Sequence, residues 1–149
     1  SAAGYSVARR SQWSAGGPVS ADIWLGDSLG EMALYFGLAH AALLGGSFAP
    51  LGGQNLIEAA ACACPVVMGP HTFNFSDAAA LAVEQCAALQ VQDMQAALDH
   101  VAFALAHPEW LAQAQAATVQ LLDKGRGAVA SHIKALQSMV PLSMEEGVA

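Results

Sequence analysis

The chain has 149 residues, of which 55% are hydrophobic and 11% are charged, and its formal net charge at pH 7 is −7. This length and hydrophobic content suit one domain with a sizeable core, and they exclude a disordered acidic tail. Its five Lys and Arg residues are too few for the clustered positive charge that binding to nucleic acid or to an anionic membrane surface requires. No apolar run reaches the ~18 residues of a membrane span.

Short apolar runs, each ending in glycine or a turn, alternate with helix-like stretches along the chain. They predict strands at 22–27, 41–46, 65–69 and 88–91. The first three strands are followed by predicted helices at 28–39, 55–63 and 75–87. Short buried strands that alternate with helices are typical of parallel βαβ units, so the sequence predicts an α/β fold with a parallel sheet and flanking helices.

The remainder of the chain is predicted to be helical. A helix with apolar residues close to a 3.6-residue period begins after Asp93, whose side chain suits an N-cap. A second helix starts with Pro108 in its first turn, and we expect Gly125 and Gly127 to break it before a last helix. The tail at 142–149 is expected to be disordered.

The sequence contains no internal repeat and no linker rich in proline or serine, so residues 1–149 are expected to form a single domain. The opening segment, SAAGYSVARRSQ, looks like the interior of a longer chain, and we therefore expect the sequence to be a fragment. Four aromatic residues fall on apolar faces and are expected in the core: Trp24, Phe36, Phe103 and Trp110.

The cysteines and histidines predict neither a disulfide framework nor a metal site. Cys62, Cys64 and Cys86 are too few for such a framework, and the C-x-C pair lies in an alanine-rich apolar run where small buried side chains are expected. The five histidines show no ligand spacing such as H-E-x-x-H. This cysteine usage favours a reducing, cytoplasmic compartment.

Three predicted helices open with a short polar residue followed three positions later by an acid, as in a capping box. The pairs are Ser28 with Glu31, Asn55 with Glu58, and Asn74 with Asp77. In a parallel sheet such helix starts lie at the carboxyl ends of the strands, where ligands bind in open α/β sheets. For the first and third pairs taken alone, ordinary helix capping is the favoured explanation.

The second pair follows a segment rich in glycine, GGSFAPLGGQNLIE at 45–58. Four glycines within nine residues exceed what a turn needs, and glycine lets a ligand approach the backbone closely. Free amides and the dipole at a helix start favour a phosphate group, and Glu58 is suited to accept hydrogen bonds from a ribose diol. The segment therefore predicts a nucleotide-sugar site, although it is neither a Walker A nor a G-x-G-x-x-G loop.

Four motifs occur together: GDSLGEM (26–32), GGSFAPLGGQNLIEAAA (45–61), PVVMGPHTFNFSD (65–77) and GRGA (125–128). In this order and spacing they resemble the C-terminal half of the bacterial 3-deoxy-D-manno-octulosonic acid (Kdo) transferases. The resemblance implies the Rossmann-like C-terminal half, here partial, of a GT-B glycosyltransferase. It also implies inverting, metal-independent transfer of Kdo from CMP-Kdo, which is a substrate and not a cofactor, to a lipid A precursor in lipopolysaccharide biosynthesis.

The same resemblance implies an enzyme on the cytoplasmic face of the bacterial inner membrane, associated with the membrane through its N-terminal half. That half, with its acceptor site and proposed catalytic base, is not in this sequence, nor are the first strands of the C-terminal half with their basic donor-binding residues. We therefore expect no catalytic residue and no metal ligand here, and no transfer by this chain alone.

The resemblance assigns donor binding to residues on three neighbouring loops. They are Ser28, Gly30 and Glu31 on the first, Gly45, Gly46, Ser47, Gly52, Gly53, Gln54, Asn55 and Glu58 on the second, and His71 and Asn74 on the third. Gln54 departs from the family, which more often has His there. Because Gln carries no charge, position 54 is not expected to be an obligatory proton carrier.

Two other interpretations stay open: a GT-B half that uses a UDP-sugar donor, and a non-catalytic α/β module that docks against a partner. The sequence assigns no role to Arg9, Arg10 or Arg126, which are either solvated or close to the donor site or to a missing part. Phe48 and Phe73, in the second and third loops, are equally suited to pack on a base or on a neighbouring loop.

Overall fold

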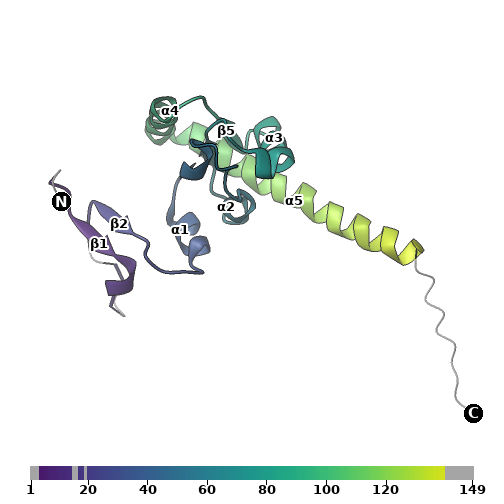
Figure 1. Ribbon diagram of the computed structural model, residues 1–149, viewed down its shortest axis with the longest axis horizontal. Coiled ribbons are helices and arrows are strands. Elements are labelled where there is room, and N and C mark those ends of the chain that lie inside the picture. The colour runs from purple at the N-terminus through teal and green to yellow at the C-terminus, as the bar shows by residue number, and fades with distance from the viewer. Residues whose placement is uncertain (1–3, 15–16, 19, 140–149) are drawn as a thin grey trace, which may run out of the picture.

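The computed structural model describes residues 4–14, 17–18 and 20–139 (Figure 1). The strands are β1 (Val7–Arg9), β2 (Ile23–Leu25), β3 (Ala42–Leu44), β4 (Val66–Met68) and β5 (Ala88–Gln90). The helices are α1 (Met32–Leu38), α2 (Ile57–Ala61), α3 (Ser76–Glu84), α4 (Met94–Ala106) and α5 (Pro108–Met139). Short 3-10 turns lie at Arg10–Gln12, Gly45–Ser47 and Phe73–Phe75. The predicted strands, and the predicted helices as far as α4, are confirmed with shorter bounds.

The strands form two separate parallel sheets. β3, β4 and β5 lie side by side in that order, with Ala42 opposite Val66 and Val66 opposite Ala88. β2 pairs with β1, which was not predicted, and Val7 lies opposite Ile23. Figure 1 shows this two-stranded ribbon apart from the three-stranded sheet. The predicted parallel α/β arrangement is confirmed, but β2 and β3, consecutive in the chain, are not neighbours.

Serine–aspartate pairs join β1 and β2 at both ends. Before the strands, Ser6 N and Oγ donate to Asp22 Oδ2 at 2.8 and 2.7 Å. After the strands, Ser11 N and Oγ donate to the two carboxylate oxygens of Asp27 at 2.9 and 2.8 Å. These hydrogen bonds lower the pKa of both carboxyls. The polar pairs therefore help to fix the register of a ribbon whose second strand is exposed along its whole length.

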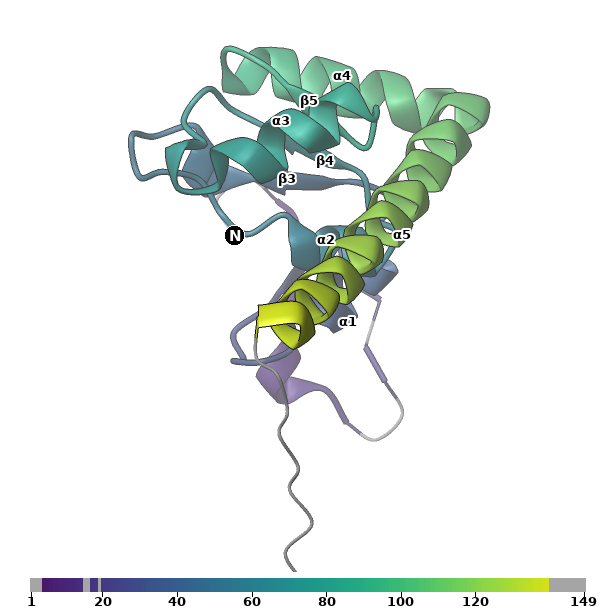
Figure 2. The same ribbon diagram turned by 90° about the vertical axis from the view of Figure 1, so that its right-hand side faces the viewer.

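Side chains of β4 alternate between the two faces of the three-stranded sheet. Val66 and Met68 belong to a buried cluster with residues of α1, α2, α3 and α5, whereas Val67 belongs to a second cluster that includes Ala97 of α4. Figure 2 shows α4 on one side of the sheet, and α2 with α5 on the other. Because helices cover both faces, all three residues of β4 are buried, as is typical of a parallel sheet.

The N-cap predicted for α4 is confirmed, since Asp93 Oδ1 accepts a hydrogen bond from Ala96 N at 2.9 Å. Of the helices in the described part of the chain, none has both the length and the hydropathy that crossing a membrane would need.

The long helix α5 begins at Pro108 as predicted, but the predicted break at Gly125 and Gly127 is wrong, because α5 continues to Met139. A glycine inside a helix costs about 1 kcal/mol relative to alanine, and each further helical residue adds a backbone hydrogen bond once the helix is nucleated. The predicted tail at 142–149 lies outside the described residues.

The aromatic residues expected in the core are only partly there. Phe36 is buried, but Trp24, Phe103 and Trp110 are half-exposed, so their assignment to the core was wrong. Trp24 lies on the ribbon, where it meets Trp13 edge to face with ring centres 5.6 Å apart. Phe103 and Trp110 form a similar pair at 5.7 Å between α4 and the start of α5. These rings pack on each other, which stabilises them without full burial against the sheet.

Cysteine burial follows the prediction in part. Cys64 is buried, and burial raises the pKa of its thiol. Cys62 is partly buried, whereas Cys86 is exposed. Cys86, for which the sequence made no burial prediction, lies in the turn between α3 and β5 with a φ of 57°.

Acid should loosen the ribbon. The serine hydrogen bonds hold the folded-state pKa of Asp22 and Asp27 below the ordinary value of 3.8, so their stabilisation is complete above that value and is lost as the pH falls through the lowered folded pKa. We expect the amide signals of Ser6 and Ser11 in NMR spectra to move in a transition centred below 3.8. In Asp27→Asn the Ser11 amide should show no transition. A midpoint at the ordinary value would contradict this account.

Candidate functional site

The carboxyl ends of β3 and β4 are joined through one fully buried side chain, that of Ser47. Its Oγ donates a hydrogen bond to Leu44 O at 2.5 Å and accepts one from Gly69 N at 2.7 Å. Its carbonyl oxygen accepts a further bond from His71 N at 3.0 Å. These bonds hold the loop after β3 against the loop after β4.

We call the surface formed by these two loops, residues 45–56 and 69–75, the carboxyl rim. Close packing between the loops explains two of its glycines. Gly52 has a φ of 92°, and a Cβ there would lie 2.1 Å from Asn74 Nδ2. Gly53 has a φ of 85°, and a Cβ there would lie 3.1 Å from the backbone oxygen of His71 in the loop after β4. Contacts within the protein thus require glycine at both positions, where the sequence alone had suggested a ligand.

Asn74 connects the loop after β4 to the loop after β3 by hydrogen bonds and does not cap a helix. Its Nδ2 donates to Leu51 O at 3.4 Å, and its backbone N donates to Gly52 O at 3.1 Å. α3 begins at Ser76 without a side-chain cap, so the predicted capping pair of Asn74 and Asp77 is wrong. The 3-10 turn lies between the loop and the helix and moves the helix start beyond the reach of Asn74.

Gly45 differs from the other glycines of the carboxyl rim. It is exposed, its φ is outside the left-handed region, and no atom lies within 4 Å of the place where a Cβ would be. At Gly46 a Cβ would lie 3.2 Å from the side chain of Gln54, whose Oε1 accepts a hydrogen bond from Gly46 N at 3.2 Å. Protein contacts therefore account for Gly46 in part and leave the open backbone at Gly45 unexplained.

α2 is shorter than the helix predicted at 55–63, and the amide of its first residue is already bonded to a side chain. α2 spans Ile57–Ala61, so its dipole is small. Asn55 Oδ1 accepts from Ile57 N at 3.0 Å, and Asn55 Nδ2 lies 3.5 Å from Glu58 Oε1. The predicted pair therefore meets, but through side chains and not as a reciprocal capping box. The exposed carboxylate of Glu58 retains acceptor positions for a ligand.

The loop after β2 is held by Glu31. Arg10 Nη2 donates to Glu31 Oε1 at 2.6 Å, and Ser28 Oγ donates to the other carboxylate oxygen while it lies 2.8 Å from Tyr35 OH. The bonds from Ser28 and from Arg10 lower the pKa of Glu31. α1 begins at Met32 without a side-chain cap. Ser28 and Glu31, the predicted capping pair, therefore bond each other through their side chains and do not cap the helix.

The predicted donor-binding residues thus fall into two groups. The residues predicted on the loops after β3 and β4 lie on the carboxyl rim, and Glu58 adjoins it. Ser28, Gly30 and Glu31 lie on the loop after β2, and within the described ranges no hydrogen bond or ion pair joins them to the rim. Phe48 packs against the cluster under α4, which places it on the protein and not on a base, whereas Phe73 is exposed.

Sequence reasoning did not assign Arg10 or Tyr35 to this region. The contact between Arg10 and Glu31 spans 21 positions and depends on the pairing of β1 with β2. The spacing of Ser6 with Asp22 and of Ser11 with Asp27, 16 positions in both cases, was the available sign of that pairing.

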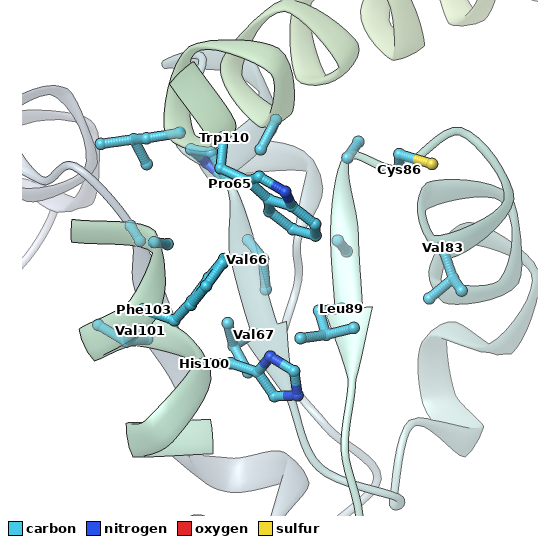
Figure 3. Close-up of a pocket in the computed structure, with 16 residues that line it drawn as sticks. Pro65, Val66, Val67, Val83, Cys86, Leu89, His100, Val101, Phe103 and Trp110 are labelled. Atoms are coloured by element: carbon cyan, nitrogen blue, oxygen red, sulfur yellow. The ribbon is translucent and has the colours of Figure 1, made fainter. Parts of the chain in front are cut away.

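An apolar cavity of about 210 Å³ lies at the other end of the strands (Figure 3). It is bordered by Pro65 before β4 and Ala88 at the start of β5, and by His100, Phe103 and Trp110 from the helices. Its apolar lining suits neither a phosphate nor a ribose. Among the described side chains no three His, Cys, Asp or Glu residues converge as a metal site would require.

Comparison with known proteins finds homologues of the chain. No family model matches the chain. It is 53% identical over 107 residues to a 3-deoxy-D-manno-octulosonic acid transferase of Bordetella pertussis, which covers 72% of this chain and 25% of that protein. It is 41% identical over 81 residues to the Haemophilus influenzae transferase, with coverage of 54% and 19%. The chain is a homologue of the Kdo transferases.

The homology also extends to a solved structure. The C-terminal CMP-Kdo binding domain of WaaA from Acinetobacter baumannii matches with a TM-score of 0.71 and 33% identity, over 79% of this chain and 61% of that one. The chain therefore has the Rossmann-like α/β fold of the C-terminal half of a GT-B transferase. It spans about a quarter of the length of the Bordetella pertussis Kdo transferase.

Substitutions at the glycines should separate packing from open backbone. Gly52→Ala forces alanine into a positive φ and against Asn74, so it should lower the free energy of unfolding by at least ~2 kcal/mol. Gly45→Ala is the matched control, because its methyl group meets no protein atom, and it should change stability by less than about 0.5 kcal/mol. Urea unfolding measures both. Equal losses would contradict the packing described for the carboxyl rim.

Proposed function

We propose that this chain forms the donor-binding part of a glycosyltransferase that uses CMP-Kdo. The observation that carries the proposal is the match over 79% of the chain to a domain described as binding CMP-Kdo. The carboxyl rim adds support, because ligands of open α/β sheets bind outside the carboxyl ends of the strands. The apolar cavity lies at the opposite ends of the strands and has no part in the proposal.

In this proposal the open backbone at Gly45, next to Gly46, receives a phosphate group of the donor. Glu58, exposed and beside the start of α2, accepts hydrogen bonds from the ribose diol. Ser47 and Asn74 serve the site by fixing the two loops, since their side chains bond within the protein. Gln54, Asn55 and His71 line the space between these groups.

Positive charge for the donor phosphate comes mainly from outside this chain. Arg10 is paired with Glu31 and Arg9 with Asp27, and the formal net charge is −7. The two sheets offer a place for further residues, because β2 and β3 each have a single strand neighbour among the described residues. Parallel strands of a longer protein would join these edges and bring basic side chains to the rim.

The complete enzyme, in this proposal, transfers Kdo with inversion and without a metal ion to a lipid A precursor. The acceptor site, the catalytic base and the contact with the cytoplasmic face of the inner membrane belong to an N-terminal half. This chain alone would bind the donor but would not transfer it.

Nucleotide preference tests the donor. We expect CMP, titrated into the 15N-labelled 149-residue chain, to shift the amide signals of Gly45, Gly46 and Gly53 more than UMP or UDP does. A preference for UDP would favour a UDP-sugar enzyme instead. No response to any of the three nucleotides would favour a non-catalytic docking module. Either result would end the CMP-Kdo assignment.

Gly45→Ala offers a second test, because the protein itself does not need glycine there. If the donor approaches this backbone, the added methyl group should weaken CMP binding about tenfold, equivalent to ~1.4 kcal/mol, while the unfolding midpoint stays in place. Gly37→Ala is a matched control, since a Cβ there also meets no atom within 4 Å and Gly37 lies in α1, outside the rim. Equal CMP affinity in the wild type and in Gly45→Ala would argue against contact at Gly45.

A further inference from the structure

The loop after β2 is attached to the β1–β2 ribbon through Arg10. Arg10 Nη2 lies 2.6 Å from Glu31 Oε1, and the two side chains are 29% and 30% exposed. The guanidinium carbon of Arg10 lies 5.1 Å from the centre of the Trp13 ring, and Nε is buried without a hydrogen-bond partner among the described residues. The position of the guanidinium therefore depends on Glu31 and Trp13.

Glu31 is where the contacts of this loop meet. One carboxylate oxygen bonds Arg10 and the other bonds Ser28, whose hydroxyl also contacts Tyr35 OH. The Tyr35 ring in turn covers Gly26, where a Cβ would come within 2.7 Å of the ring carbon Cζ. The beginning, middle and end of the loop are thus held by one chain of contacts that ends at Arg10.

Between these fixed points the backbone of the loop is open. Leu29 is 100% exposed. Gly30 has a φ of 78°, and no atom lies within 4 Å of the place where its Cβ would be. The orientation of these two peptide groups is therefore set by the residues on either side and not by packing of their own.

We propose that Arg10 is a positioning residue of the donor site, which acts through Glu31 to orient the open backbone of Leu29 and Gly30 toward the nucleotide sugar. The ligand part of this inference rests on the proposed function together with the resemblance, which assigns Gly30 and Glu31 to donor binding. Both oxygens of Glu31 are engaged within the protein. Glu31 accordingly acts on the loop, and the contact with the donor falls to the backbone beside it.

Arg9 provides the matched comparison, because it is adjacent and carries the same charge. Its side chain is 55% exposed, and its Nη1 lies 3.6 Å from Asp27 Oδ2. Asp27 is already held by two hydrogen bonds from Ser11, and an exposed ion pair of this kind contributes little. Loss of the Arg9 charge should therefore leave the loop in place.

The test compares Arg10→Gln, Arg10→Lys and Arg9→Gln in the 15N-labelled 149-residue chain. Arg10→Gln should shift the amide signals of Leu29 and Gly30 and raise the pKa of Glu31, because the charged partner of its carboxylate is lost. Arg10→Lys should restore part of both, since Lys keeps the charge but not the planar fork of donors. Arg9→Gln should change neither. CMP affinity should fall about tenfold in Arg10→Gln.

A double variant shows whether Arg10 acts through Glu31. Glu31→Gln should weaken CMP binding as much as Arg10→Gln, and the two together should weaken it no further. Losses that multiply would mean that Arg10 meets the ligand itself, and would overturn the inference. Unmoved Leu29 and Gly30 signals in Arg10→Gln would overturn it too, and should that variant not fold, unmoved signals in Glu31→Gln would do so. If the wild type fails to bind CMP, the proposed function fails, while the amide signals still decide the positioning role.

Discussion

The Ser47 hydroxyl is the contact on which the carboxyl rim depends. It is at once a donor to Leu44 at the end of β3 and an acceptor for Gly69 at the end of β4. The backbones of Ser47 and Gly69 lie so close together that a Cβ on Gly69 would be 2.5 Å from Ser47 O. With the strand ends fixed in this way, the two loops meet at Gly52 and Asn74. The open backbone at Gly45 then has a defined position on the carboxyl rim, and the exposed carboxylate of Glu58 lies close to Asn55 of the same rim.

Features that depend on neighbours in the sequence could be predicted, and those that depend on distant pairing could not. The strands β2 to β5 and the Asp93 cap follow from apolar runs, periodicity and a single polar residue. β1 was missed because three residues that end in arginine form no apolar run, and its pairing appears in the sequence only as two serine–aspartate pairs of equal spacing. The half-exposed Trp24 follows from the same cause, since it lies on that small ribbon.

The glycines of the carboxyl rim show the limit of composition as an argument. Four glycines in one loop suggested a ligand, yet Gly52 and Gly53 are required by a second loop some twenty residues further along the chain. Only the three-dimensional structure distinguishes Gly52 and Gly53 from Gly45, where no protein atom occupies the space that a side chain would take. The resemblance to the Kdo transferases is confirmed by the homologues found, because its motifs combine loop residues and helix starts in a fixed order.

In the proposal, the charges of the donor site are divided between this chain and a longer protein. The rim would supply backbone amides and the adjoining Glu58 its carboxylate, while the arginines of the ribbon are paired with Asp27 and Glu31. A crystal structure of the chain with CMP tests the central claim most directly. We predict phosphate oxygens at hydrogen-bond distance, about 2.9 Å, from amides of residues 45–47, with the ribose beside Glu58. CMP bound away from the carboxyl rim, for example at the amino ends of the strands, would contradict it.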